Sequence, residues 1–350
     1  MRIGMPMAYS GGFTETVAEL IDYERAGLDV VNVPEAYSFD SVSQLGFLAA
    51  KTSRVEISSG ILNIYSRTPS LLAMTAAGLD YVSGGRFVLG LGASGPQVVE
   101  GFHGMPYHAP LARTREVAEI CRKVWRREPV VHDGAHYHLP LDREHGGSGA
   151  GKALKLINHP VRERIPMVLA ALGPKNVSLA AELFEGWEPI FYYPEGARAA
   201  FGDAIDAGLA LRDPSLGPLQ VMVDTHMAIT EDEVEQEAAL RQVRNHLALY
   251  IGGMGARGKN FYNDLTRRYG FEEAAESIQD LFLGGHKAEA AAAVPDALAH
   301  GVALVGPAAW VKERIDAFAE AGVTTLNAKP LAATHERRVR DIAALKEMAS

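Results

Sequence analysis

With 350 residues, of which 47% are hydrophobic and 22% charged, the chain is long enough for one large α/β domain or two small ones. The formal net charge of -9 argues against nucleic acid or an anionic membrane as the main partner. The single cysteine, Cys121, excludes an internal disulfide, and the N-terminus lacks the long apolar core of a signal peptide. No run of residues reaches the length of a membrane span, so we expect a cytoplasmic protein.

Short apolar runs rich in β-branched residues alternate with segments of helical periodicity along the whole chain. Eight of these runs are expected to form strands: residues 2–7, 28–33, 55–65, 86–91, 165–170, 187–192, 219–229 and 323–328. Helices are expected at residues 14–26, 41–51, from Pro69 onward, and at 112–125, 177–184, 195–209, 231–250, 311–321 and the C-terminal end. This alternation predicts an α/β fold, a (β/α)8 TIM barrel that forms one domain over residues 1–350, with insertions after strands four and seven.

The sites of such barrels lie where the strands end, at the C-terminal rim. Four segments of this chain fall at that rim by their place in the pattern. They are Glu35 and residues 60–65, 92–103 and 173–176. We therefore expect the functional residues among them.

A glycine-rich turn follows the fourth strand, where Gly90, Gly92 and Gly95 succeed one another. Glycine lets main-chain N–H groups come close to a bound anion, so a phosphate is the expected guest. The run also matches the G-x-G-x-x-G pattern of dinucleotide-binding folds, but the glycines and prolines of residues 101–110 exclude the long helix that such folds need. We predict a phosphate site without a Rossmann fold, and a tight turn without a ligand is the alternative.

The chain between strands four and five is expected to hold a hairpin and a flexible loop. Asp133-Gly134 is a strong signal for a two-residue turn. Residues 143–152 form the flexible loop, within which residues 146–152 imitate a phosphate-binding P-loop; Ala153 stands where Ser or Thr is required, so a mobile lid is the better interpretation. A hairpin with exposed side chains is favoured over a metal site for the three histidines of this region, His132, His136 and His138.

Six motifs spread over nearly the whole chain carry a family resemblance. They are the runs at residues 83–95, 101–104, 113–116, 170–176, 253–255 and 259–262. Together they resemble the bacterial luciferase-like flavin and deazaflavin oxidoreductases, especially the branch that uses coenzyme F420. Members of this family are commonly dimers, so the resemblance also implies a homodimer.

The resemblance implies that the cofactor is coenzyme F420, with FMN as the alternative, and that its ring lies across the barrel mouth against the third strand. A non-proline cis peptide often supports the ring in this family, and Gly60-Ile61 is the matching position, with Asn63 close by. The cofactor phosphate is expected between two turns, formed by Gly92, Ala93, Ser94 and Gly95 on one side and by Leu172, Gly173, Pro174, Lys175 and Asn176 on the other.

One departure from the family pattern concerns proton transfer. Related deazaflavin enzymes often carry Asp-His at the end of the second strand, whereas this chain has Glu35-Ala36. Glu35 or Tyr37 could replace the histidine as proton donor, or Glu35 could instead cap the next helix or pair with an arginine. His103 could reach substrate or cofactor, and a hydrogen-bonded structural histidine is its alternative role.

The sequence therefore predicts a hydride-transfer oxidoreductase that acts on a C=C, C=N or C=O bond of a small organic molecule. Resemblance to the methylenetetrahydromethanopterin reductases points to an imine-like substrate. An FMN-dependent monooxygenase of the same family is the nearest alternative. A metal-dependent barrel hydrolase is disfavoured because the first strand lacks His-x-His, and a non-catalytic flavin-binding protein is the third alternative.

Overall fold

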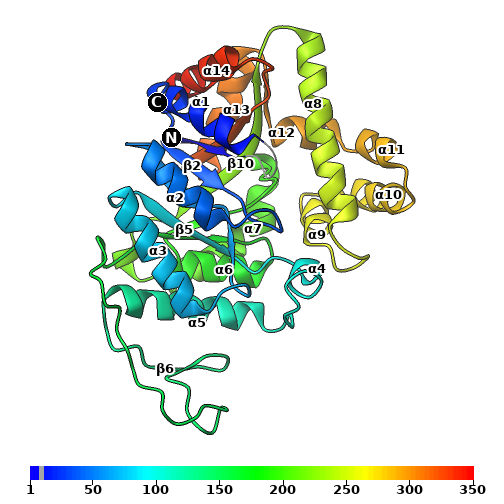
Figure 1. Ribbon diagram of the computed structural model, residues 1–350. Coiled ribbons are helices and arrows are strands. Elements are labelled where there is room, and N and C mark those ends of the chain that lie inside the picture. The colour runs from blue at the N-terminus through cyan, green and yellow to red at the C-terminus, as the bar shows by residue number, and fades with distance from the viewer. Residues whose placement is uncertain (8–11) are drawn as a thin grey trace.

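The computed structural model describes residues 1–7 and 12–350 (Figure 1). Eight parallel strands of this described chain form a barrel: β1 (Arg2–Pro6), β2 (Val30–Val33), β3 (Glu56–Ser59), β5 (Phe87–Gly92), β8 (Met167–Ala170), β9 (Gly186–Glu188), β10 (Gln220–Ile229) and β12 (Thr325–Pro330). Neighbours in this order pair with each other, and β12 pairs with β1, so the sheet closes on itself. The predicted TIM barrel is confirmed.

Helices cover the outside of the barrel (Figure 1). They are α1 (Phe13–Arg25), α2 (Ser41–Lys51), α3 (Pro69–Ser83), α5 (Pro110–Trp125), α6 (Pro174–Leu183), α7 (Pro194–Leu209), α13 (Ala308–Glu320) and α14 (His335–Met348). Local chemistry sets several of their starts. Asp40 accepts a hydrogen bond from the Val42 N–H at the start of α2, and Thr68 accepts one from the Leu71 N–H before the proline that opens α3.

The barrel interior changes from apolar to polar along the strands. Near the strand starts, one apolar cluster fills it, made of Val30, Val88, Val168 and Met222. Side chains two residues further along a strand face the same way, so Asn32 and Asp224 also point inward. Asp224 is paired in register with Asn327, and Glu188 is paired with Ala170, which brings further polar groups to the same level. The polar end of the interior is the end that opens at the C-terminal rim.

The two predicted insertions are confirmed. After β5 the chain forms the short helix α4 (Pro96–Val99), α5, and a hairpin of β6 (His132–Asp133) and β7 (His138–Leu139) that extends beyond α5 (Figure 1). After β10 come α8 (Glu233–Ala248), a π-helical turn (Leu249–Gly253), α9 (Phe261–Arg268), α10 (Glu272–Leu283), α11 (Lys287–Ala292), α12 (Asp296–Gly301) and β11 (Leu304–Gly306). The 3₁₀ turn Pro214–Leu216 precedes β10.

Two local predictions need correction. The expected third strand is split, because β3 ends at Ser59 and the separate β4 (Leu62–Asn63) pairs with β5. The predicted two-residue turn at Asp133-Gly134 is also wrong. Asp133 pairs with His138, so the turn spans residues 134–137. A buried carboxylate explains the longer turn, because Glu116 accepts hydrogen bonds from the main-chain N–H groups of His136 at 3.2 Å and Tyr137 at 3.0 Å.

The loop at residues 143–152 shows no contact with the barrel mouth among the described residues. Its hydrogen bonds stay within the excursion: Gly147 donates to the Asp142 carbonyl at 2.6 Å, and the His145 N–H donates to the Asp142 carboxylate. The His145 ring stacks on that of His138, with centroids 3.4 Å apart. These contacts do not support the predicted role of a lid.

Candidate active site at the barrel mouth

The C-terminal rim divides into two sides with different chemistry. The glycine side follows β2, β3, β5 and β8, which are consecutive in the sheet and carry all the site residues expected from the sequence. The histidine side follows β9, β10 and β12 and is completed by α8 and α9 of the second insertion. The fold thus brings the predicted residues together on one side and adds a second side that the sequence analysis missed.

Close main-chain packing characterises the glycine side. The Gly60-Ile61 peptide is cis, as expected. A Cβ atom added to Gly92 would come within 2.8 Å of Ile61 Cδ1, so a side chain at position 92 would require the Ile61 side chain to move. Ser94 adopts a left-handed conformation with φ 53°, which turns the chain directly after β5. This backbone leaves the space above the cis peptide free of side chains from β5.

The turn at Gly173 starts α6 without a side-chain cap. Leu172, Gly173 and Asn176 are half-buried, whereas Pro174 and Lys175 are exposed. An uncapped helix start presents main-chain N–H groups and the positive end of the helix dipole. The Lys175 ammonium adds a positive charge at the same place, so the turn can accept an anion.

Asn63 supplies the sharpest sign of a ligand on this side. Its Oδ1 accepts a hydrogen bond from the Tyr65 N–H at 2.9 Å, whereas its buried Nδ2 has no partner. A buried donor without an acceptor is rare and costs about 1 to 3 kcal/mol. A flat cofactor with carbonyl oxygens at its edge would satisfy this donor, so the residues present fit a flavin or deazaflavin ring.

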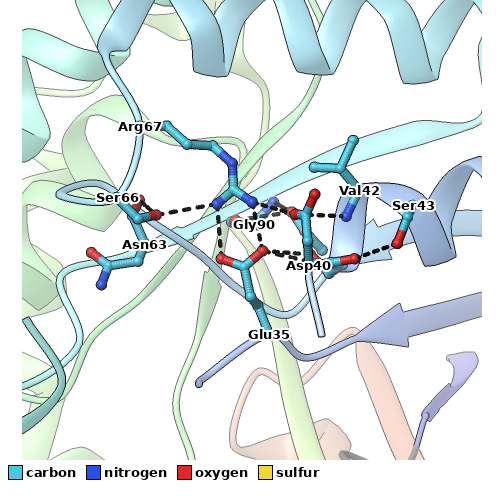
Figure 2. Close-up of polar contacts among 10 residues, drawn as sticks. Glu35, Asp40, Val42, Ser43, Asn63, Ser66, Arg67 and Gly90 are labelled. Carbon is cyan, nitrogen blue, oxygen red and sulfur yellow. Dashed lines mark hydrogen bonds and ion pairs between the residues drawn. The ribbon is translucent and has the colours of Figure 1, made fainter. Parts of the chain in front are cut away.

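Glu35 is held in an ion pair rather than left free (Figure 2). Arg67 donates to its two oxygens at 2.8 and 2.7 Å and also contacts Asp40. The Glu35 carboxylate further accepts from the main-chain N–H and the hydroxyl of Ser41, both at 3.2 Å. This arrangement raises the pKa of Arg67, mainly through its hydrogen bonds with Glu35. Glu35 thus takes both alternative roles considered for it, pairing with an arginine and capping a helix.

Tyr37 and His103 lie near each other on the rim. Tyr37 is exposed, and its ring centroid lies 6.2 Å from that of Phe102. The half-buried His103 ring packs edge-on against Phe102, with centroids 5.2 Å apart, and its Nε2 has no partner. The loops after β2 and β5 therefore meet through aromatic rings.

The histidine side is built from rings. His226 of β10 and His246 of α8 pack edge to face, with centroids 5.1 Å apart. Further rings complete the cluster: Phe191, Tyr250 and Tyr262. Burial lowers the pKa of His226 to about 3 and that of His246 to about 4, and the charge of Lys329 acts in the same direction. Both imidazoles are therefore neutral at pH 7.

The floor of the mouth holds two carboxyl groups and two amides inside the barrel. Glu188 Oε1 accepts hydrogen bonds from Asn32 Nδ2 at 2.5 Å and from Asn327 Nδ2 at 3.4 Å. Burial and the nearby Asp224 raise the pKa of Glu188, and burial raises the pKa of Asp224 to about 6. Polar residues at inward positions of otherwise apolar strands were the sequence signal for this cluster.

The three hairpin histidines have other partners. His132 contacts Glu116 at 3.2 Å, His138 contacts Asp133 at 2.9 Å, and the His136 ring packs edge-on against that of His108. Over the described residues, no group of three or more His, Cys, Asp or Glu side chains is arranged to hold a metal ion. No helix in the described ranges has both the length and the apolar character to cross a bilayer.

Comparisons with known proteins agree with this geometry. The family model described as luciferase-like monooxygenase matches residues 1–325. A Mycobacterium tuberculosis protein assigned as a coenzyme F420-dependent oxidoreductase is 42% identical over 350 residues, which cover 99% of each chain. The 5,10-methylenetetrahydromethanopterin reductase of Archaeoglobus fulgidus is 29% identical over 307 residues, 86% of this chain and 85% of the other. The solved structure of the coenzyme F420-dependent tetrahydromethanopterin reductase from Methanopyrus kandleri has a TM-score of 0.79 at 21% identity, covering 99% of this chain and 97% of the other, and supports the fold.

Proposed function

Since the chain belongs to the luciferase-like monooxygenase family, we propose that it is a coenzyme F420-dependent oxidoreductase. It transfers a hydride between the deazaflavin and a C=C, C=N or C=O bond of a small organic substrate. The observation that carries this proposal is the unpaired, buried Nδ2 of Asn63 beside the cis peptide on the glycine side. The relative named for coenzyme F420, which is 42% identical to this chain, favours the deazaflavin over FMN.

In this proposal the glycine side binds the cofactor. Gly60, Ile61 and Asn63 hold the ring, and two turns hold the phosphate, namely Gly92 to Gly95 and Leu172 to Asn176. The bound deazaflavin supplies or accepts the hydride at its ring carbon. The protein's own residues orient the two reactants and exclude water.

The substrate lies on the histidine side in this proposal, between the ring cluster and the cofactor. Tyr37 and His103 contact it from the rim, whereas Glu35 positions the loop after β2 through Arg67. The similarity to methylenetetrahydromethanopterin reductases favours an imine-like, C=N substrate over the other two bond types.

A binding titration tests the cofactor assignment. Purified protein is titrated with oxidised coenzyme F420 and, in parallel, with FMN, while the quenching of cofactor fluorescence is followed. We expect at least tenfold tighter binding of coenzyme F420. A preference for FMN, together with oxygen uptake in the presence of a reductant, would make the FMN-dependent monooxygenase the correct function. Binding of neither would overturn the proposal.

We also propose that the protein is a homodimer. The outer face of α3 carries exposed apolar side chains at helical spacing: Leu71, Met74, Tyr81 and Val82. A cluster of this kind on one helix face is typical of a protein interface. Light scattering after gel filtration should give twice the mass of one chain, and Tyr81→Glu should yield monomers. Val234→Glu, at an exposed position of α8, is the matched control and should stay dimeric.

A further inference from the structure

The carboxyl groups at the floor of the mouth are surrounded by acceptors that lack donors. Asn32 and Asn327 each direct their Nδ2 toward Glu188. Three buried oxygens of the cluster then remain without a hydrogen bond: Asn32 Oδ1, Asn327 Oδ1 and Asp224 Oδ1. Ionised carboxylates can only accept hydrogen bonds, so they cannot supply the missing donors. A proton on either carboxyl group would supply one.

Electrostatics points the same way. Glu188 and Asp224 lie above the apolar cluster of the barrel interior, and no cation in the described chain forms an ion pair with either of them. Two carboxylates that share an apolar site repel each other, so one of them keeps its proton at a pH where an exposed acid is ionised. Burial raises the pKa of both groups, and the charge of Asp224 raises that of Glu188 further, whereas the hydrogen bond with Asn327 lowers the pKa of Asp224.

The floor is open toward the mouth on the side of Asp224. Glu188 is buried, whereas Asp224 retains partial exposure. Asp224 stands two residues before His226 on the same face of β10, so the path from its carboxyl group to solvent runs past the histidine side. The floor also reaches the glycine side, because a Cβ atom on Gly60 would come within 2.0 Å of Asn32 Oδ1. The pair therefore lies beneath the meeting point of the two sides.

Reduction of a C=N or C=O bond needs a proton as well as a hydride. Position 36 holds alanine, Glu35 is bound by Arg67 and Ser41, and His226 and His246 are neutral through burial. Of the acids in the described part of the mouth, the floor pair is the one built to stay protonated. Among the described carboxyl groups there, the pair combines a stored proton with access to the mouth.

We propose that Glu188 and Asp224 form a buried acid pair that holds a proton at neutral pH, and that Asp224 delivers it to the substrate. This inference rests on the proposed function. A hydride from the reduced deazaflavin adds two electrons and a hydrogen to the substrate carbon. The proton leaves the Asp224 oxygen and forms the new bond at the neighbouring nitrogen, oxygen or carbon. The pair is left with one more negative charge and regains a proton from solvent, and oxidation runs these steps in reverse.

Infrared spectroscopy of the protein without cofactor tests the stored proton directly. At pH 7 we expect a band from a protonated carboxyl group that shifts in D2O. Asp224→Asn and Glu188→Gln should each change or remove it, and if one variant does not fold the other still reports. Asp341→Asn is the matched control, because Asp341 is a second acid whose pKa is raised by burial, on α14 and paired with Arg337. The absence of the band, or a band indifferent to both floor variants, would overturn the proposal.

A kinetic readout then separates proton delivery from a structural role. In the reductive direction, Asp224→Asn should lower kcat by about 100-fold or more with little change in KM. The wild-type rate should fall as pH rises through the titration of the pair. Groups that face the pair and shape this profile are His226 on β10, Lys329 on β12 and His246 on α8. Glu188→Gln, which changes a positioning residue, should shift the pH midpoint and retain more activity.

Failure of this inference is distinguishable from failure of the proposed function. If wild-type protein does not bind coenzyme F420, the function is wrong whatever the infrared band shows. If it binds the cofactor and Asp224→Asn keeps the wild-type rate and pH profile, the function stands and the acid pair is not the proton source.

Discussion

The two sides of the barrel mouth differ in what shapes them, which is the main chain on one side and side chains on the other. The glycine side is shaped by the main chain: a cis peptide, a glycine (Gly90) whose Cβ would lie 1.8 Å from the Ser59 carbonyl oxygen, and an uncapped helix start. The histidine side is shaped by side chains, most of them aromatic and drawn from β10 and the second insertion. Main-chain geometry suits a cofactor that many proteins share, whereas exchangeable side chains suit a substrate particular to one protein. This difference explains why the site residues expected from the sequence all lie on the first side, although the motif at residues 259–262 contributes Tyr262 to the second.

The largest expected effect concerns the ion pair that holds the rim of the glycine side. Glu35→Gln removes the carboxylate that Arg67 and Ser41 contact, and it leaves a largely buried guanidinium with the Asp40 carboxylate and the Ser66 hydroxyl as its remaining partners. Loss of one partner of a buried pair is strongly destabilising, so urea unfolding should show a loss of about 3 kcal/mol.

Asp40→Asn is the control for this substitution. Asp40 is exposed, and asparagine can still accept the hydrogen bond from Val42 at the start of α2, so we expect a loss below about 1 kcal/mol. Equal losses for the two variants would show that Glu35 is not fixed by Arg67 and would restore it as a candidate proton donor.

The next effect tests whether the glycine side depends on its main chain. Gly92→Ala places a Cβ atom 2.8 Å from Ile61 Cδ1, so the Ile61 side chain, directly after the cis bond, must shift. Coenzyme F420 affinity should fall by about 10- to 100-fold in the fluorescence titration. Gly46→Ala is the matched control, because its Cβ would meet no atom within 4 Å and Gly46 lies in α2, outside the proposed cofactor residues; its affinity should stay within about twofold. The reverse order of the two would contradict the assignment of the ring to this place.

The barrel and the main-chain geometry of the glycine side could be predicted because their signals are local. Strand and helix periodicity lies within each segment, and glycine is required where the main chain itself makes the contact. The arginine that pairs with Glu35 could not be identified from the sequence, because Arg67 comes from another βα unit. The length of the hairpin turn was predicted wrongly for a similar reason, because the carboxylate that accepts a hydrogen bond from the turn belongs to Glu116 of α5. To predict the histidine side, one would have to know which side chains of β10 point inward and how α8 packs against the barrel. No short motif carries that information.

Stability as a function of pH should separate the histidine side from the floor beneath it. A histidine whose pKa is lowered on folding binds fewer protons in the native state, so it costs stability as pH falls below its ordinary value of about 6.5. An acid whose pKa is raised on folding does the opposite and costs stability as pH rises through about 6.

When the pH is lowered from 7.5 to 4.5, the stability of His226→Phe relative to wild type should therefore rise, and that of Asp224→Asn relative to wild type should fall. We expect each difference to be on the order of 1 to 2 kcal/mol, because partial exposure of both side chains reduces the full value of the shifts. Thermal unfolding at the two pH values measures both. If both variants gained stability, or both lost it, the histidine rings and the carboxyl groups would not affect the pH dependence of stability in opposite directions.

The smallest effect on stability comes from the edge of the ring cluster and bears most directly on the division of the mouth. His246 Nδ1 is buried without a partner, so His246→Phe removes an unsatisfied polar atom, keeps a ring of similar shape and should stabilise the protein by about 1 kcal/mol. His132→Phe should instead destabilise it, because His132 contacts the buried Glu116. The His246 variant should bind coenzyme F420 as wild type does while its KM for substrate changes. If it weakened cofactor binding as much as Gly92→Ala, the ring cluster would belong to the cofactor site, and substrate choice would have to reside in the rim residues Tyr37 and His103.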